Sequence, residues 1–220
     1  IKQIQVCFTR TAHNMSIMGA FRRRLGGFLM NICVYGASSA TLDGVYIAAG
    51  EQLGKLMAER GHALVFGGGA SGLMGAAARG EHSAHGRVIG IAPTFFSADG
   101  VIYKDCDEFI PTTTMRERKQ LLEEKSDAYI MAPGGIGTFD EFFEMLTLKQ
   151  LGRHDKPMVV FNTAGYYDSL LAMIENGIEK EFIFPTVREL YFVTDSVDES
   201  LDYIEHYEAK GVDASHYKNV

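Results

Sequence analysis

The 220-residue sequence has no tryptophan, five prolines and three cysteines. Cys7, Cys33 and Cys106 are far apart, odd in number and form no CxxC pair. They therefore offer neither a disulfide framework nor a zinc site, and their pattern fits a reducing cytoplasm. The sequence also lacks an apolar run of the length needed to span a membrane. We expect a cytoplasmic protein without a metal ion or a membrane partner.

Acidic residues are missing from the first 29 positions, although the whole chain has a formal net charge of -7 and a pI near 5.5. The overall acidity argues against nucleic acid as the main partner. Residues 1–29 contain five Lys or Arg, and Arg22-Arg23-Arg24 before an apolar run imitates a signal peptide. That run is better explained as a first core strand, NICVYG, at 31–36. We therefore expect 1–29 to be a basic extension, a candidate for sequence upstream of the native start. A basic interaction arm is the alternative, and 30–220 is predicted to be a single domain.

Short apolar runs alternate with helical stretches from residue 31 onward. Strands are predicted at 31–36, 63–68, 87–93, 128–133, 158–162 and 190–195. Helices are predicted near 43–60, 72–84, 114–126, 138–151, 166–180 and 197–209. Continuous apolar runs are typical of strands buried on both faces. The alternation predicts an α/β fold, a doubly wound and mostly parallel sheet with helices on both faces.

Glycine-rich turns follow three of the predicted strands, at 35–39, 66–75 and 133–138. In a parallel sheet these turns lie at the edge where ligands bind. The second has the spacing Gly67-x-Gly69-x-x-Gly72 of a dinucleotide fingerprint, but the next strand offers no acid for the ribose hydroxyls of NAD before Asp99. The P-loop pattern GxxxxGK[ST] is absent. The three turns together favour backbone binding of one anionic group, whereas tight packing would explain any single turn.

Two segments have the spacing of a helix capping box: Thr114 with Glu117, and Thr138 with Glu141. A capping box explains one threonine and one acid in each segment, but not their charged neighbours. We expect both segments to start a helix and to have a further role.

Three cations, Arg116, Arg118 and Lys119, lie in the first turn of the helix predicted at 114–126. The helix dipole disfavours cations at this end, so their presence suggests an anionic ligand. Solvated surface charges are the alternative, and for Arg116 that interpretation is preferred.

Three carboxylates, Asp140, Glu141 and Glu144, follow the glycine turn at 133–138. Phosphate-binding N–H groups and a carboxylate would then lie about one helical turn apart, roughly the distance from a 5′-phosphate to the anomeric carbon of a ribose. Cleavage of an N-glycosidic bond at that carbon passes through an oxocarbenium-like transition state. A carboxylate can stabilise this charge and orient water, while an arginine holds the substrate and helps the base to leave.

The segments PGGIGTFDE and TMRERK together resemble the Lonely Guy family of cytokinin riboside 5′-monophosphate phosphoribohydrolases. The first reads PGGxGTxxE, and the second supplies an Arg-Lys pair. The resemblance continues through FGGGASGLMG and LKQLGRHDKP and covers nearly everything from Met30 to about Phe192. It implies a Rossmann-like fold and a homodimer with active sites at the subunit interface. It also implies hydrolysis of AMP or N6-prenylated AMP to free base and ribose 5-phosphate, without a metal or other cofactor.

The resemblance also implies roles for individual residues. Arg118 and Glu141 match the catalytic pair. The positions that match substrate or phosphate contacts are Gly68, Gly69, Ser71, Gly72, Met115, Lys119, Gly134, Gly135, Gly137, Thr138 and Thr147. Family members often place a substrate-contacting Glu after the third strand, where this sequence has only Asp99, so recognition of the base or ribose is less well defined than phosphate binding. Nothing in the sequence marks a pyridoxal-phosphate lysine.

One alternative explains the glycine turns without a hydrolysis reaction. A non-catalytic Rossmann-type binding protein for a phosphorylated cofactor, similar to molybdenum-cofactor carriers, would not need both Arg118 and Glu141. The presence of both residues favours the hydrolase.

Overall fold

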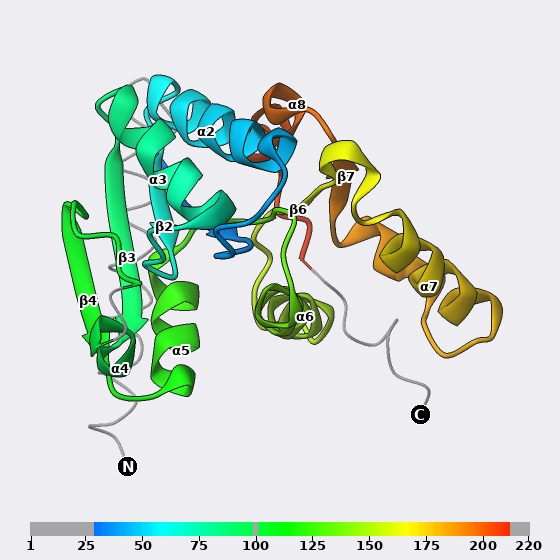
Figure 1. Cartoon of the computed structure of the whole chain (residues 1–220). Coiled ribbons are helices and arrows are strands. Elements are labelled where there is room, and N and C mark those ends of the chain that lie inside the picture. The colour runs from blue at the N-terminus through cyan, green and yellow to red at the C-terminus, as the bar shows by residue number, and fades with distance from the viewer. Residues whose placement is uncertain (1–28, 99–100, 212–220) are drawn as a thin grey trace, which may run out of the picture.

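A seven-stranded sheet forms the centre of the computed structural model, which describes residues 29–98 and 101–211 (Figure 1). Its strands are β1 Asn31–Tyr35, β2 Ala63–Phe66, β3 Arg87–Pro93, β4 Glu108–Thr112, β5 Ala128–Met131, β6 Met158–Phe161 and β7 Phe192–Thr194. Their order is β4-β3-β2-β1-β5-β6-β7, and all neighbouring strands of this described sheet pair in parallel. The prediction of an α/β fold with a doubly wound sheet is confirmed.

Helices cover both faces of the sheet (Figure 1). One face carries α2 Gly44–Glu59, α3 Gly72–Ser83 and α8 Val197–Glu205, and the other carries α5 Met115–Lys125, α6 Ile136–Gln150 and α7 Asp168–Glu179. Each face of the sheet and its helices enclose one hydrophobic core. Along β1, Ile32 and Val34 pack into the core on the first face, while Cys33 and Tyr35 pack into the core on the second face. Successive strand residues point to opposite faces, so a strand buried on both faces must be apolar throughout. The short helix α4 Thr94–Ala98 and the 3₁₀ turns η1 Thr163–Gly165 and η2 Pro185–Glu189 complete the described elements.

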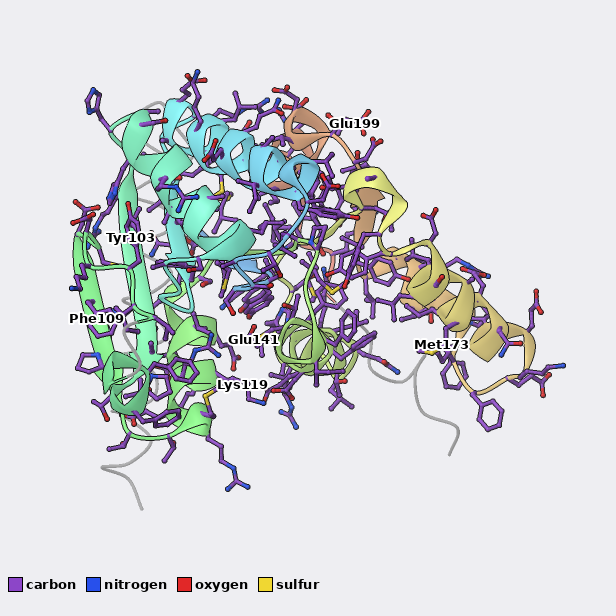
Figure 2. All side chains as sticks on the ribbon, in the orientation of Figure 1. Tyr103, Phe109, Lys119, Glu141, Met173 and Glu199 are labelled. Atoms are coloured by element: carbon purple, nitrogen blue, oxygen red, sulfur yellow. The ribbon has the colours of Figure 1, made fainter. Side chains whose placement is uncertain are left out.

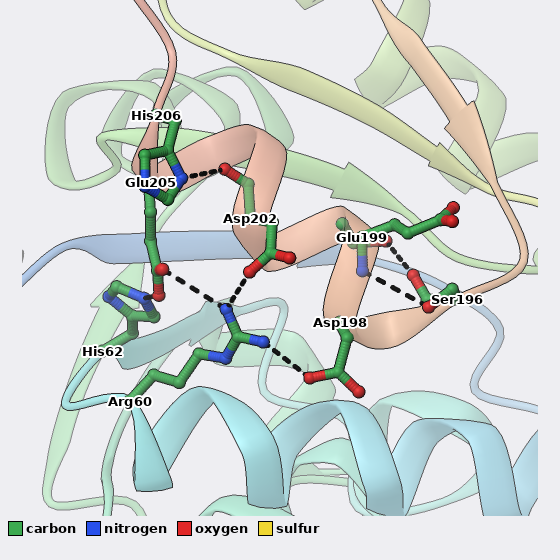
Figure 3. Close-up of polar contacts among 9 residues, drawn as sticks. Arg60, His62, Ser196, Asp198, Glu199, Asp202, Glu205 and His206 are labelled. Carbon is green, nitrogen blue, oxygen red and sulfur yellow. Dashed lines mark hydrogen bonds and ion pairs between the residues drawn. The ribbon is translucent and has the colours of Figure 1, made fainter.

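Polar contacts tie α8 to the end of α2, at the edge of the sheet where the strands begin (Figure 3). Arg60 places Nη1 2.6 Å from Asp202 and Nη2 2.6 Å from Asp198. His62, just before β2, lies 2.9 Å from Glu205 through Nε2. These contacts hold α8 against the sheet. The glycine turns lie at the opposite edge, where the strands end.

The strand β4 was missed by the sequence analysis, which predicted only six strands. β4 lies at the edge of the sheet, it contains Pro111, and its side chains are mostly half-exposed. An edge strand can contain proline because one side of its backbone has no ladder partner. Its sequence, EFIPT, therefore has no continuous apolar run. Residues 1–28 of the predicted basic extension, and Asp99, lie outside the described residues.

Candidate functional site

A cavity of about 580 Å³ opens at the carboxyl ends of β1, β2 and β5. This is where the strand order reverses, the place at which ligands bind in open α/β sheets. The three glycine turns predicted to meet at one edge all contribute to it. Its lining residues are Gly36, Ala37, Ser38, Ser39, Gly67, Gly69, Ser71, Met74, Phe96, Val101, Ile102, Met115, Arg118, Gly135, Gly137, Thr138 and Glu141.

The loop before α6 exposes backbone to this cavity. α6 begins at Ile136 with Gly135 as its N-cap, and within the described chain no side chain caps it. The predicted capping box of Thr138 with Glu141 is therefore wrong: the helix starts two residues earlier, and both residues lie inside it. A Cβ added to Gly135 or Gly137 would meet no described atom within 4 Å, because these positions face the open cavity. An uncapped helix start facing open space suits an anion.

A second helix start reaches the same cavity from β2. α3 begins after Ser71, whose hydroxyl makes no capping hydrogen bond in the described structure. Gly72 has φ +64°, and a Cβ there would lie 2.6 Å from the carbonyl oxygen of Ala37. Only glycine therefore allows the turn after β2 to pack this closely against the turn after β1.

Arg118 and Glu141 form a buried ion pair on the wall of the cavity. Arg118 is 6% exposed and Glu141 is 7% exposed. The Nη1 of Arg118 donates to Oε1 of Glu141, and its Nε donates to the carbonyl of Ile91 at 3.2 Å. Its Nη2 lies over Gly67, where an added Cβ would come within 2.0 Å of it. The carboxylate of Glu141 and the carbonyl of Ile91 thus hold the guanidinium in one orientation. Gly67 leaves room for it because glycine has no side chain.

Two opposing effects act on the pKa of Glu141. Burial raises the pKa above the ordinary value of 4.5, and the charge and hydrogen bond of Arg118 lower it, with a net rise. Figure 2 shows Glu141 on the side of α6 that faces α5. A carboxylate in this setting can accept a proton from water or stabilise a neighbouring cation.

Two predicted ligand contacts, Lys119 and Thr147, lie elsewhere. They line a separate hollow of about 580 Å³ along α6, together with Ile136, Phe139, Asp140, Phe143, Glu144 and Leu148. The Nζ of Lys119 is 3.1 Å from Asp140 and 2.9 Å from Glu144. Partial burial lowers the pKa of Lys119, but these two partners outweigh it and raise the pKa.

The other predicted site residues fall into two groups, those that line the cavity and those that lie outside its lining. Gly69, Ser71, Met115, Gly135, Gly137 and Thr138 line the cavity with the Arg118–Glu141 pair, while Gly68, Gly72 and Gly134 lie in the same turns but outside the lining. A Cβ on Gly134 would lie 2.1 Å from Oγ1 of Thr138, so this glycine makes room for that side chain. Arg116 is exposed, as its interpretation as a surface charge predicts.

Sequence reasoning missed the apolar wall of the cavity. Met74, Phe96, Val101 and Ile102 form it, and none of them was predicted as a site residue, although Met74 lies in the segment FGGGASGLMG. A run such as TFFSADGVIY after a strand is a signal for such a wall, because apolar residues at the carboxyl edge of a sheet lie where ligands bind.

Residues 29–98 and 101–211 contain no group of three or more His, Cys, Asp or Glu side chains placed to hold a metal ion. Within the same ranges, each helix is too short or too polar to cross a membrane.

Comparisons with known proteins give consistent results. The family model described as "Possible lysine decarboxylase" matches residues 74–204. A protein of Mycobacterium tuberculosis named cytokinin riboside 5′-monophosphate phosphoribohydrolase is 39% identical, over 77% of this chain and 90% of its own length. A protein of Arabidopsis thaliana with the same activity in its name is 38% identical, over 80% of this chain and 82% of its own length.

Solved structures share the fold at lower identity. A molybdenum cofactor binding protein of Rippkaea orientalis has a TM-score of 0.61 and 23% identity, over 79% of this chain and 94% of its own. A molybdenum cofactor carrier protein of Chlamydomonas reinhardtii also has a TM-score of 0.61 and 23% identity, over 80% and 96% of the two chains. The structural likeness concerns the fold, and the sequence matches decide the family. The chain belongs to the Lonely Guy family, which the model "Possible lysine decarboxylase" describes.

Proposed function

We propose that this protein hydrolyses the N-glycosidic bond of AMP and N6-modified AMP, releasing the free base and ribose 5-phosphate. The observation that carries this proposal is the buried pair of Arg118 and Glu141 beside the uncapped start of α6, in one cavity. The names of the relatives at 38–39% identity support the same reaction.

In the proposed reaction, the 5′-phosphate binds the N–H groups at the start of α6. Glu141 follows Thr138 by three residues, which is about 4.5 Å along the helix axis. Its carboxylate then lies near the anomeric carbon, where it stabilises the oxocarbenium-like transition state and orients the attacking water. The water oxygen bonds to the anomeric carbon, the N-glycosidic bond breaks, and the base leaves with a proton.

Arg118 has two proposed roles in this reaction. Its permanent charge lowers the pKa of Glu141 and so favours the ionised form that the reaction needs. The orientation of its guanidinium, fixed by Ile91 and Gly67, also presents Nη2 at the cavity wall as a donor for the substrate. The apolar wall, which includes Phe96 and Ile102, offers contact surface to the base and its N6 substituent.

The experiment for this proposal compares the wild type with Glu141→Gln. AMP and N6-isopentenyl-AMP are incubated with each protein, free base is measured by chromatography, and AMP binding is measured by calorimetry. We expect the wild type to release base, and Glu141→Gln to bind AMP without turnover. Unchanged turnover in the variant would remove Glu141 from the mechanism. Absence of base from every purine monophosphate would refute the proposal.

We further propose that two copies of the chain form a homodimer with the active sites at their interface. Ile136, at the start of α6, is 81% exposed and lies with Phe139 and Phe143 in the hollow that holds Lys119 and Thr147. An exposed isoleucine next to two partly buried phenylalanines beside the site favours coverage by protein. Light scattering at micromolar concentration should give twice the chain mass, and a monomer would contradict the proposal.

The dispersed cysteines support a cytoplasmic location, which fractionation of cells would test.

A second candidate function is that of a carrier for a phosphorylated cofactor, because solved molybdenum-cofactor carriers share the fold. A carrier does not need the Arg118–Glu141 pair. Native mass spectrometry that found a bound pterin, together with no base release, would favour the carrier over the hydrolase.

A further inference from the structure

Three consecutive carbonyl groups lead into the uncapped start of α6, and each accepts a hydrogen bond. The hydroxyl of Tyr167 donates to Ala132 at 2.7 Å, the N–H of Ala37 donates to Pro133 at 3.0 Å, and the hydroxyl of Tyr166 donates to Gly134 at 2.8 Å. Neither tyrosine lines the cavity. Two of the three carbonyls are therefore held from outside the cavity by neighbouring side chains.

The last of these contacts fixes a peptide unit that would otherwise be free to turn. A peptide is planar and trans, so fixing the oxygen of Gly134 also fixes the direction of the N–H of Gly135. Both flanking residues are glycines, which restrict rotation of this peptide less than any other residue pair. If the peptide flipped, its carbonyl oxygen would replace an N–H group at the place where an anion binds. The Tyr166 hydroxyl opposes this flip.

The two tyrosines come from a strained turn after β6. In η1, Ala164 has φ 54° and Gly165 has φ 70°, so both adopt the left-handed region. A non-glycine residue in this region costs of order 1 kcal/mol and persists only where its surroundings enforce it. Here the side chain of Asn162 enforces the turn, because its Oδ1 accepts from the N–H of Tyr167 at 2.7 Å.

Ring packing holds both tyrosines in place. Tyr167 is 1% exposed, and its ring meets that of Phe139, a residue of α6, edge to face at 6.2 Å. Tyr166 meets Tyr46, a residue of α2, edge to face at 5.9 Å. The pair thus bridges the loop, the helix that it starts and the opposite layer of helices.

We propose that Tyr166 and Tyr167 are positioning residues that orient the loop 133–138 to receive the phosphate of the substrate. This inference rests on the proposed function, because it concerns the same site. Neither tyrosine touches the reacting atoms. Their hydroxyls determine which backbone groups of the loop face the cavity.

The test removes one hydroxyl and measures phosphate recognition separately from recognition of the base. Tyr166 is 42% exposed, so Tyr166→Phe should fold normally. Calorimetry with ribose 5-phosphate and with adenosine is done on the wild type and the variant. We expect ribose 5-phosphate to bind about fivefold more weakly to Tyr166→Phe, the effect of one neutral hydrogen bond, and adenosine affinity to be unchanged. Tyr207→Phe is the matched control, because it loses a 2.6 Å bond to Asp155 outside the cavity lining.

Equal affinity of the wild type and Tyr166→Phe for ribose 5-phosphate would overturn the proposal, and so would a parallel loss of adenosine binding. Tyr167→Phe should show the same phosphate-selective loss, and a variant that lost both ligands equally would count against its positioning role. Ribose 5-phosphate is not cleaved, so this result does not depend on hydrolysis. A wild type that binds ribose 5-phosphate but releases no base from AMP would refute the proposed function alone.

Discussion

Arg118→Ala tests the buried ion pair through the stability of the protein. The substitution would leave Glu141, which is 7% exposed, without its cation and its donor. Removing one partner of a buried pair costs about 3–5 kcal/mol, because an uncompensated charge remains. Removing the charge of both partners leaves no such penalty. We therefore expect Arg118→Ala to lower the free energy of unfolding by about 3–5 kcal/mol, and the double variant Arg118→Ala/Glu141→Gln to lose less.

The loss in Arg118→Ala should also depend on pH. Burial already raises the pKa of Glu141 against the lowering effect of Arg118, so removing Arg118 raises this pKa further. A carboxyl group whose folded pKa exceeds its unfolded value costs stability above the unfolded pKa, and the cost disappears below it. Each additional unit of pKa corresponds to about 1.4 kcal/mol. The loss should therefore be larger at pH 7 than near pH 4.5, the ordinary pKa of the group.

Urea unfolding of the wild type, both single variants and the double variant at the two pH values measures these differences. A double variant as unstable as Arg118→Ala would refute the reasoning, because the penalty would not then come from a stranded carboxylate. A loss that is the same at both pH values would refute it equally.

Three further predictions concern other parts of the molecule. Gly67→Ala places a Cβ 2.0 Å from Nη2 of Arg118, so base release should fall at least about tenfold, whereas Gly44→Ala, with no described atom within 4 Å of the new Cβ, should leave it unchanged. Equal rates for the two variants would count against the role of Gly67. Burial raises the pKa of Glu81 to about 9, against a smaller lowering by the N–H of Arg87. Glu81→Gln should therefore raise the free energy of unfolding at pH 7 by up to about 3 kcal/mol. This gain should vanish near pH 4.5, the group's ordinary pKa, and urea unfolding that showed a constant difference would contradict the prediction. Base release should fall as the pH drops through the raised pKa of Glu141, and a pH–rate profile that Glu141→Asp does not alter would assign the acid limb to another group.

The central strands of the fold could be predicted from the sequence, and its edge could not. β1 from Ile32 onward, β5 and β6 are buried on both faces, so their runs are apolar and stand out without any tertiary information. β4 has one paired side and half-exposed residues, so its sequence has no such run. What makes it a strand is its pairing with β3, a non-local contact.

The candidate site could be predicted to a similar extent. Glycine turns at strand ends identified the loops, because parallel strands place their carboxyl ends at one edge. The residues alone gave only a cluster of cations and a cluster of carboxylates, and the resemblance to the Lonely Guy family selected Arg118 and Glu141 from them. The predicted start of α6 was wrong. Thr138 followed by Glu141 has the spacing of a capping box, but the N-cap of the helix is Gly135. Thr147 lies six residues from Glu141, which on a helix with 3.6 residues per turn is a different face. The structure accordingly places it in the other hollow.

The contacts of Tyr166 and Tyr167 with the phosphate loop could not be predicted. They join segments more than 30 residues apart, across β6 and its following turn. The dipeptide carries no motif of its own, and only the tertiary structure brings its hydroxyls to Ala132 and Gly134.

The most direct test of the central claim is to measure both products of AMP and N6-isopentenyl-AMP with the full chain. Hydrolysis of the N-glycosidic bond predicts free base and ribose 5-phosphate in equal amounts, from the wild type and not from Glu141→Gln. Release of inorganic phosphate with the nucleoside, or of no product at all, would contradict the proposed function.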